Sequence, residues 1–138
     1  MLFAKTPGLV EYLVIMAGGA LGSGARVWIS WAVAMRFGES FPWGTILVNV
    51  SGCLAIGLFV GLTGPESPFL VAPLLRQAVA LGVLGGFTTF SSFSIQTLAL
   101  ASHGQWFNAS GNVLLSVVVC LAATWLGGML ASAFVSRF

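Results

Sequence analysis

The sequence predicts an all-α membrane protein with four transmembrane helices. Of its 138 residues, 58% are hydrophobic and 6% are charged, and the mean hydropathy is +1.03. Water-soluble domains carry about 25% charged residues, so these few charges could not cover a water-facing surface. A spanning helix needs about 20 mostly apolar residues, and four such helices with short connectors account for the length. The arithmetic disfavours an extramembrane catalytic domain, and we expect no enzyme.

Polar residues, glycine and proline divide the chain into four apolar segments of membrane-spanning length. We expect helices because a helix in lipid satisfies its own backbone hydrogen bonds. Trp43, Trp106 and Phe107 lie near segment ends, where aromatic side chains gather at the membrane interface. The expected helices cover approximately residues 9–35, 43–63, 73–101 and 108–134, within one transmembrane domain of residues 1–138.

The flanking cations give only a weak signal for orientation. Lys5, Arg76 and Arg137 would share one side of the membrane, and Arg36 would lie on the other. Cytoplasmic loops usually carry the excess of Lys and Arg, but a difference this small permits both orientations. The two halves show no long-range repeat, so any inverted symmetry would come from the association of two chains.

Small residues recur four positions apart in every segment, a spacing that lets helix backbones approach closely. These pairs are Gly18 and Gly22, Gly57 and Gly61, Gly82 and Gly86, and Gly127 and Ala131. They predict a tightly packed bundle with contacts between subunits. Because four helices leave little room to surround a permeation path, a pore would require an oligomer.

Carboxylates are absent from the expected membrane interior. Glu11 lies near the start of the first segment, and Glu39 and Glu66 lie in connectors. A proton relay or a cation-selective ring would use buried Asp or Glu. The sequence therefore disfavours both of these mechanisms.

No metal site formed by side chains is expected. His103 is the only histidine and lies in a polar connector without a cluster of Cys, Asp or Glu. Cys53 and Cys120 lie in apolar runs, so neither is expected to form a disulfide. The net charge of +2 is too diffuse to indicate nucleic-acid binding.

The first two segments carry a deep cation and a deep amide. Arg26 lies about two-thirds along the first segment, where its side chain either snorkels to the interface or reaches into the bundle. Thr45, Asn49 and Cys53 are spaced four apart and share one helical face. Asn49 either joins helices by hydrogen bonds or lines a pore.

The third segment contains the most informative run, from Gly82 to Ser94. Adjacent glycines weaken a helix, and the five hydroxyl residues within 88–94 can satisfy backbone groups that a break would free. We therefore predict a helix interruption near the middle of the membrane. Phe90 and Phe93 lie on nearly one face beside these hydroxyls, including Thr89 and Ser91. Aromatic rings have a positive edge, so this surface favours a small anion.

The fourth segment repeats the pattern more weakly. Asn112, Ser116 and Cys120 again lie on one face at intervals of four. They either extend a polar path or bind one helix to another.

Three motifs together resemble the Fluc (CrcB-type) fluoride channels of microbes. They are GGALGSGAR at 18–26, WGT through VN at 43–49, and GGFTTFSSFS at 85–94. The third motif is highly specific, and the order and spacing of the other two strengthen the match. The resemblance covers essentially the whole chain.

This resemblance implies an antiparallel, dual-topology homodimer with two fluoride pores in the inner (plasma) membrane. It implies passive fluoride efflux, which reduces fluoride toxicity in the cytoplasm. It also implies a structural sodium ion (Na+) at the dimer centre, held by backbone carbonyls that here belong to Gly85 and Thr88.

Site residues carry over from the family by position. Arg26 matches an arginine near the vestibule. The fluoride path would be lined by Phe90, Phe93, Asn49, Ser91, Thr89, Asn112 and Ser116. Gln96 departs from the family pattern, since relatives commonly carry a glutamate three residues beyond the second phenylalanine.

Two other functions remain as alternatives. A proton-coupled small multidrug transporter is also a four-helix, dual-topology chain, but it needs a carboxylate embedded in the first helix, and Glu11 lies too near the end of that segment. An inert structural subunit of a larger complex would explain the glycine spacing. It would not explain the cluster at 85–94.

Overall fold

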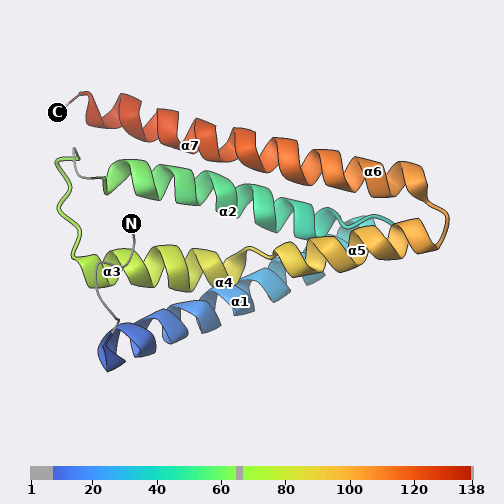
Figure 1. Cartoon of the computed structure of the whole chain (residues 1–138), viewed down its shortest axis with the longest axis horizontal. Coiled ribbons are helices and arrows are strands. Elements are labelled where there is room, and N and C mark those ends of the chain that lie inside the picture. The colour runs from blue at the N-terminus through green and yellow to red at the C-terminus, as the bar shows by residue number, and fades with distance from the viewer. Residues whose placement is uncertain (1–7, 65–66, 138) are drawn as a thin grey trace.

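The computed structural model describes residues 8–64 and 67–137, and these residues form four long spans that are apolar enough to cross a membrane (Figure 1). The first two spans are α1 (Leu9–Phe37) and α2 (Trp43–Leu62). The third comprises α3 (Pro73–Gln77), the π-helical segment η1 (Ala78–Leu84), α4 (Gly85–Phe87) and α5 (Phe90–Ser102). The fourth comprises α6 (Trp106–Leu114), the π-helical segment η2 (Leu115–Val119) and α7 (Cys120–Val135).

The predicted fold class is confirmed. The described residues contain helices and no strand, and the third span is interrupted in its middle at Thr88–Thr89. The fourth span begins at Trp106, two residues earlier than expected, and the π-helical segments η1 and η2 were not predicted. Lys5 and Glu66, which entered the charge arguments above, lie outside the described residues.

The spans alternate in direction. α1 and the third span run one way along the bundle, and α2 and the fourth span run back (Figure 1). The turns that end α1 and α5 lie at the same end of the bundle. Each contains a glycine with positive φ, Gly38 at 77° and Gly104 at 74°, a conformation that glycine adopts without a Cβ penalty.

The parallel helices α2 and α7 pack at close backbone distance and form the most extensive contact between elements. A Cβ atom placed on Gly57 would lie 2.2 Å from the Thr124 carbonyl oxygen. One placed on Gly127 would lie 2.4 Å from the Leu54 carbonyl oxygen. Only glycine permits this approach, so small residues set the register between the two helices.

The helix α1 packs in the same way against η1 and α4. A Cβ atom on Gly22 would lie 2.0 Å from the Val83 carbonyl oxygen, and one on Gly86 would lie 2.5 Å from the Gly19 carbonyl oxygen. The spaced small residues therefore bind helices within one chain. The contacts between subunits that the spacing predicts are not needed to explain these glycines.

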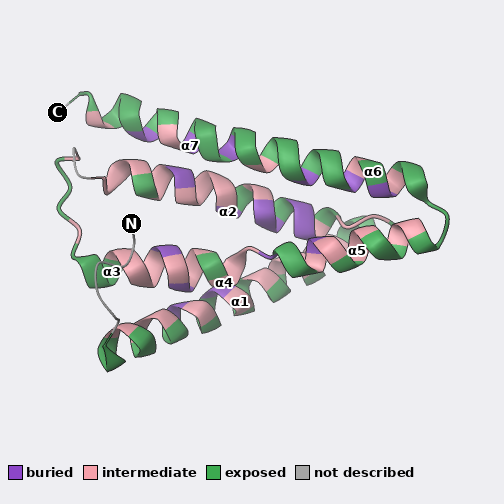
Figure 2. Ribbon diagram, viewed as in Figure 1, coloured by how far each residue is buried: buried purple, intermediate pink, exposed green. Residues whose placement is uncertain are grey.

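Polarity is directed inward in this bundle. Only a minority of the residues in each span are buried (Figure 2). The exposed residues include many large apolar side chains. The buried polar side chains are Thr45, Asn49, Thr89, Asn112 and Ser116. Such groups are costly in a membrane unless they are paired or serve a function, so they mark the region of the candidate site.

Candidate functional site

The interruption of the third span is held open by a side chain from another helix. Both residues of the break are extended: Thr88 has φ −79° and ψ 157°, and Thr89 has φ −151° and ψ 114°. Asn49 of α2 donates from Nδ2 to the Thr89 carbonyl oxygen at 3.0 Å, and the Thr89 N–H donates to Asn49 Oδ1 at 2.7 Å. One amide side chain thus satisfies the Thr89 N–H, which the break separates from its helical acceptor, and also binds the Thr89 carbonyl oxygen.

A glycine on α2 brings the two spans close enough for this clamp. A Cβ atom on Gly52, three residues beyond Asn49, would lie 2.3 Å from Thr88 Cγ2. The extended segment therefore rests against the α2 backbone. Asn49 is 9% exposed and Thr89 is 8% exposed, so the clamp is shielded from competing polar groups.

The break also redirects two helix hydrogen bonds. In a regular helix, the N–H groups of Thr89 and Ser92 would donate to the carbonyls of Gly85 and Thr88. Here the Thr89 N–H donates to Asn49, and the Ser92 N–H donates to Thr89 Oγ1 at 3.2 Å. The carbonyl oxygens of Gly85 and Thr88 therefore lack their helical donors. These are the two residues that the resemblance implies for sodium.

The side chain of Thr89 begins the second half of the span. Its Oγ1 caps α5 by accepting from the Ser92 N–H, and it donates to Ser92 Oγ at 3.1 Å. Ser91 Oγ lies 3.2 Å from the same atom. Since Thr89 has one hydroxyl proton, Ser91 is the donor of that bond. The hydroxyl run thus satisfies freed backbone groups, as the sequence predicts.

The two phenylalanines lie in different surroundings. Their ring centroids are 5.1 Å apart and their planes are inclined at 52°. Phe93 is 7% exposed, whereas Phe90 is 75% exposed on the surface of the single chain. The rings therefore form one tilted pair that leads from the outer surface into the bundle.

A chain of hydrogen bonds joins the fourth span to Phe93. Asn112, which is 1% exposed, donates from Nδ2 to Thr97 Oγ1 at 2.8 Å, and Thr97 donates to the Phe93 carbonyl oxygen at 2.7 Å. Ser116 Oγ donates to Asn112 Oδ1 at 3.4 Å. This last bond is long for a hydroxyl donor, so the Ser116 proton is weakly held and is free to turn toward another acceptor.

Sequence reasoning did not identify Thr97. It lies between Gln96 and Leu98 and on none of the spaced polar faces. A signal was present in the turn around Gly104, because residues equally distant from a tight turn between two helices face each other. Thr97 and Asn112 lie seven and eight residues from that glycine.

Polar and aromatic side chains from three spans meet in a cavity of about 320 Å³ between α2, the break and the fourth span. The described residues that line it carry no charged side chain. They are Asn49, Cys53, Thr88, Thr89, Phe90, Phe93, Ser116, Val117, Cys120 and Leu121. The cavity therefore brings together hydroxyls, an amide and aromatic rings from three spans, a set suited to a small anion rather than to a cation.

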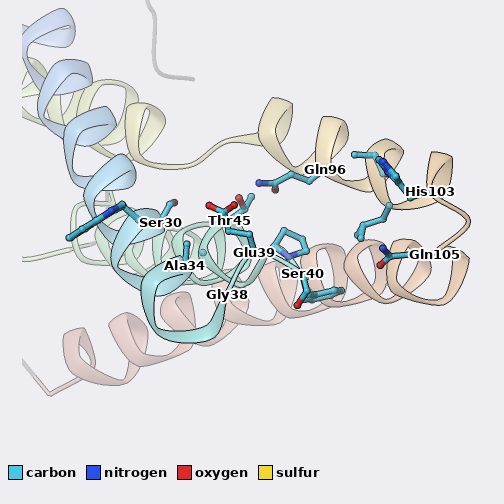
Figure 3. A pocket seen from close by; sticks show the side chains of 15 residues that line it. Ser30, Ala34, Gly38, Glu39, Ser40, Thr45, Gln96, His103 and Gln105 are labelled. Carbon is cyan, nitrogen blue, oxygen red and sulfur yellow. The ribbon is translucent and has the colours of Figure 1, made fainter.

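A larger cavity of about 720 Å³ opens between the α1–α2 turn and the end of α5 (Figure 3). Thr45, one turn before Asn49 on α2, and Gln96, three residues beyond Phe93, line it. The two cavities therefore follow one another along the same helices. The Gln96 Oε1 atom is buried without a hydrogen-bond partner among the described residues.

The structure does not bring every predicted residue to these cavities. Arg26 lines neither of them, and its Nε atom is buried without a partner among the described residues. Ser91 contacts Thr89, and Asn112 contacts Ser116, but neither Ser91 nor Asn112 lines the smaller cavity. The roles implied for these three residues remain predictions.

Comparison with known proteins identifies the family. The model for CrcB-like proteins, described as Camphor Resistance (CrcB), matches residues 13–128. The chain belongs to the CrcB family. It is 53% identical to a protein of Methylocella silvestris over 124 residues, which cover 90% of this chain and 95% of that relative. That relative is named a fluoride-specific ion channel, FluC.

Two further relatives of the CrcB chain carry the same name. The protein of Opitutus terrae is 56% identical over 120 residues, which cover 87% of this chain and 91% of the relative. The protein of Rhodospirillum rubrum is 53% identical over 118 residues, which cover 86% and 92%. With its four spanning helices, this CrcB chain is a multi-pass membrane protein of a family whose named relatives are channels rather than enzymes.

Proposed function

We propose that this CrcB chain is a fluoride-selective channel that lets fluoride leave the cytoplasm passively and so lowers its toxicity. The observation that carries the proposal is the uncharged cavity at the break, where Asn49, Phe93 and Ser116 from three spans meet. The names of the relatives supply the choice of fluoride among the anions.

Fluoride is small and strongly hydrated, so its path must replace water with closely placed donors. An amide nitrogen carries two protons, and Asn49 uses one of them on the Thr89 carbonyl oxygen. The second proton and the Ser116 hydroxyl are the donors that we assign to the anion. The edges of Phe90 and Phe93 add weak attraction without a fixed charge that would trap the ion.

We infer a homodimer of antiparallel chains with two pores. Phe90 is 75% exposed on a single chain although it lines the cavity, so a second chain would complete the wall around it. The spaced glycines are occupied by contacts within the chain, which leaves the large apolar faces for a partner chain and for lipid. In this dimer we assign Arg26 to the vestibule, as the family resemblance implies.

The carbonyl oxygens of Gly85 and Thr88 fit the proposed sodium site, because the break removes their helical donors. Unwound carbonyls in broken membrane helices coordinate Na+, and hard cations prefer oxygen ligands. A bound sodium ion would hold two chains together through such oxygens. We place the dimer in the inner (plasma) membrane, where fluoride leaves the cytoplasm.

A flux measurement in liposomes tests the function. Vesicles containing the purified protein are loaded with potassium fluoride, a potassium carrier balances charge, and a fluoride electrode records efflux. We expect rapid fluoride efflux from protein-containing vesicles and background efflux of chloride from matched vesicles. Fluoride efflux equal to that of protein-free vesicles would refute a channel, and equal chloride efflux would refute selectivity.

The same preparation tests the transporter alternative. Glu11 is the only carboxylate within Leu9–Phe37, and it lies in the first turn of α1. Proton-coupled transport predicts that an organic cation releases protons from the protein and that Glu11→Gln abolishes this release. We expect no release and an unchanged fluoride efflux in Glu11→Gln.

A further inference from the structure

Two thiol side chains face each other across the closest helix pair of the bundle. The register of the parallel helices α2 and α7 places Gly57 against Thr124, where a Cβ atom would meet the carbonyl oxygen at 2.2 Å. One turn earlier on both helices are Cys53 and Cys120. Their side chains interact with each other, and neither forms a disulfide.

Both thiols line the cavity of about 320 Å³ that also contains Asn49, Phe93 and Ser116. Both cysteines are partly exposed, so a solute in this cavity reaches their sulfur atoms. The chain has 2 cysteines in all, so no other thiol competes for a thiol-seeking ligand. Neither residue has a part in the hydrogen-bond network described above.

The surroundings restrict the ligand that such a pair would take. No group of three or more His, Cys, Asp or Glu side chains suited to a metal occurs among the described residues. A tetrahedral zinc site needs four ligands, and in a structural site these are side chains, whereas a soft ion with linear, two-coordinate chemistry needs only two thiolates. An uncharged complex is also favoured at membrane depth, because burying net charge is costly there.

The mercuric ion meets each of these conditions. Hg2+ bound by two thiolates gives an uncharged S–Hg–S unit. Each thiol gives up its proton as its sulfur bonds to the metal, so two protons are released and no atom is oxidised or reduced. Ag+ or Cu+ bound in the same way would leave one negative charge, which the apolar surroundings disfavour.

We propose that Cys53 and Cys120 together form a binding site for one soft, thiophilic divalent metal ion, and that an ion bound there obstructs the cavity. The obstruction rests on the proposed function, because it requires this cavity to be the fluoride path. The binding of the metal ion does not depend on that function. Heavy-metal ions would therefore close the channel from a site separate from the proposed anion donors.

Binding is tested with Hg2+ on the purified wild-type protein and on C53S, C120S and the double variant. Metal retained after dialysis against glutathione, a competing monothiol, is measured by mass spectrometry of the element. We expect one ion per wild-type chain and none in any variant. A second thiol on the same chain acts at a high effective concentration. Removing the ion from the wild type should therefore need about 100-fold more glutathione than removing it from either single variant. Retention by either single variant equal to that of the wild type would overturn the site.

Obstruction is tested by fluoride efflux from liposomes, with each protein compared with its own rate before Hg2+ is added. We expect Hg2+ to stop wild-type efflux, dithiothreitol to restore it, and each single variant to require about 100-fold more metal. Unchanged efflux from wild type with one bound ion per chain would refute obstruction. Absence of efflux before metal addition would refute the proposed function, while the metal count still tests the binding site.

Discussion

The third and fourth spans both depart from a regular α-helix near their middle, but their backbone hydrogen bonds are satisfied in different ways. At Thr88–Thr89 the chain is extended, and Asn49 from α2 binds the freed N–H and the carbonyl oxygen of Thr89. Through Leu115–Val119 the chain widens into η2, and its backbone bonds continue, since the Cys120 N–H still donates to the carbonyls of Ser116 and Val117. The first departure depends on another helix, and the second does not.

This difference explains why two buried asparagines have different roles. Asn49 binds backbone atoms, so it restores hydrogen bonds that lipid cannot provide. Asn112 binds the side chains of Thr97 and Ser116, so it orients groups whose own backbones are already satisfied. We therefore expect substitutions at the break to affect folding and flux together, and substitutions at η2 to affect mainly flux.

The largest effect is expected from Asn49→Leu. It leaves the buried Thr89 N–H unpaired, which costs about 1–3 kcal/mol, and it removes one bond to the Thr89 carbonyl oxygen. Fluoride efflux should fall to the level of empty vesicles, and the thermal unfolding temperature of the purified protein should drop. Ser51→Ala is the control on the same helix, because Ser51 is exposed and donates to its own helix at Leu47. An Asn49→Leu protein with wild-type flux would contradict the clamp.

The second-largest effect is expected from Phe90→Ile, which should slow fluoride efflux without destabilising the fold. Phe90 lies outside the core of the single chain, at 75% exposure, and isoleucine keeps an apolar surface there for a partner chain, so Phe90→Ile should leave the unfolding temperature near that of wild type. Loss of the ring edge beside the cavity should slow fluoride efflux by about 10-fold, the change that corresponds to about 1.4 kcal/mol. Leu98→Ile, at a position 69% exposed that does not line the cavity, is the matched control. Equal rates for both variants would remove Phe90 from the path.

A smaller effect is expected at the fourth span. Asn112→Leu removes the bonds to Thr97 and Ser116 but leaves η2 hydrogen-bonded. Efflux should fall several-fold, and stability should fall by about 1 kcal/mol, less than for Asn49→Leu. Measuring both variants under the same conditions tests the comparison directly. An equal loss of stability would show that the two regions do not differ as described.

The smallest effect is expected at Thr97. Thr97→Val keeps the shape but removes the acceptor for Asn112 Nδ2 and the donor to the Phe93 carbonyl oxygen. Efflux should fall about two- to threefold, in keeping with a net hydrogen-bond contribution of about 0.5–1.5 kcal/mol. Thr97→Ser should restore it. Thr124→Val is the control, since Thr124 makes the same bond to its own helix and lies outside this network. A rate for Thr97→Ser as low as that for Thr97→Val would assign Thr97 to packing alone.

Much of the fold followed from local patterns. Apolar length predicts the four spans, because each must cross the hydrocarbon layer. The glycine and hydroxyl run at 82–94 predicts a break, since it both weakens the helix and supplies capping groups such as Thr89. The absence of a deep carboxylate points away from protons and cations, because composition alone decides which charges are available inside the bundle.

The sequence could not show which polar side chains form hydrogen bonds to other protein groups and which line the cavity. The sequence left both roles open for Asn49, and the structure shows that it pairs with Thr89 while it also lines the cavity. The spaced glycines served contacts within one chain, which spacing cannot distinguish from contacts between chains. Thr97 lies on none of the spaced polar faces, and only its distance from the turn at Gly104 indicates its partner Asn112.

The sequence by itself therefore determined the number of spans, the position of the break and the uncharged character of the interior, because these depend on composition and on neighbours along the chain. Only the tertiary structure decided that Asn49 meets Thr89, that Asn112 meets Thr97, and that Cys53 meets Cys120. The physical reason is register. Glycines on α2 let its neighbours approach at backbone distance, which brings Asn49 to Thr89 and Cys53 to Cys120. The turn at Gly104 brings Asn112 to Thr97.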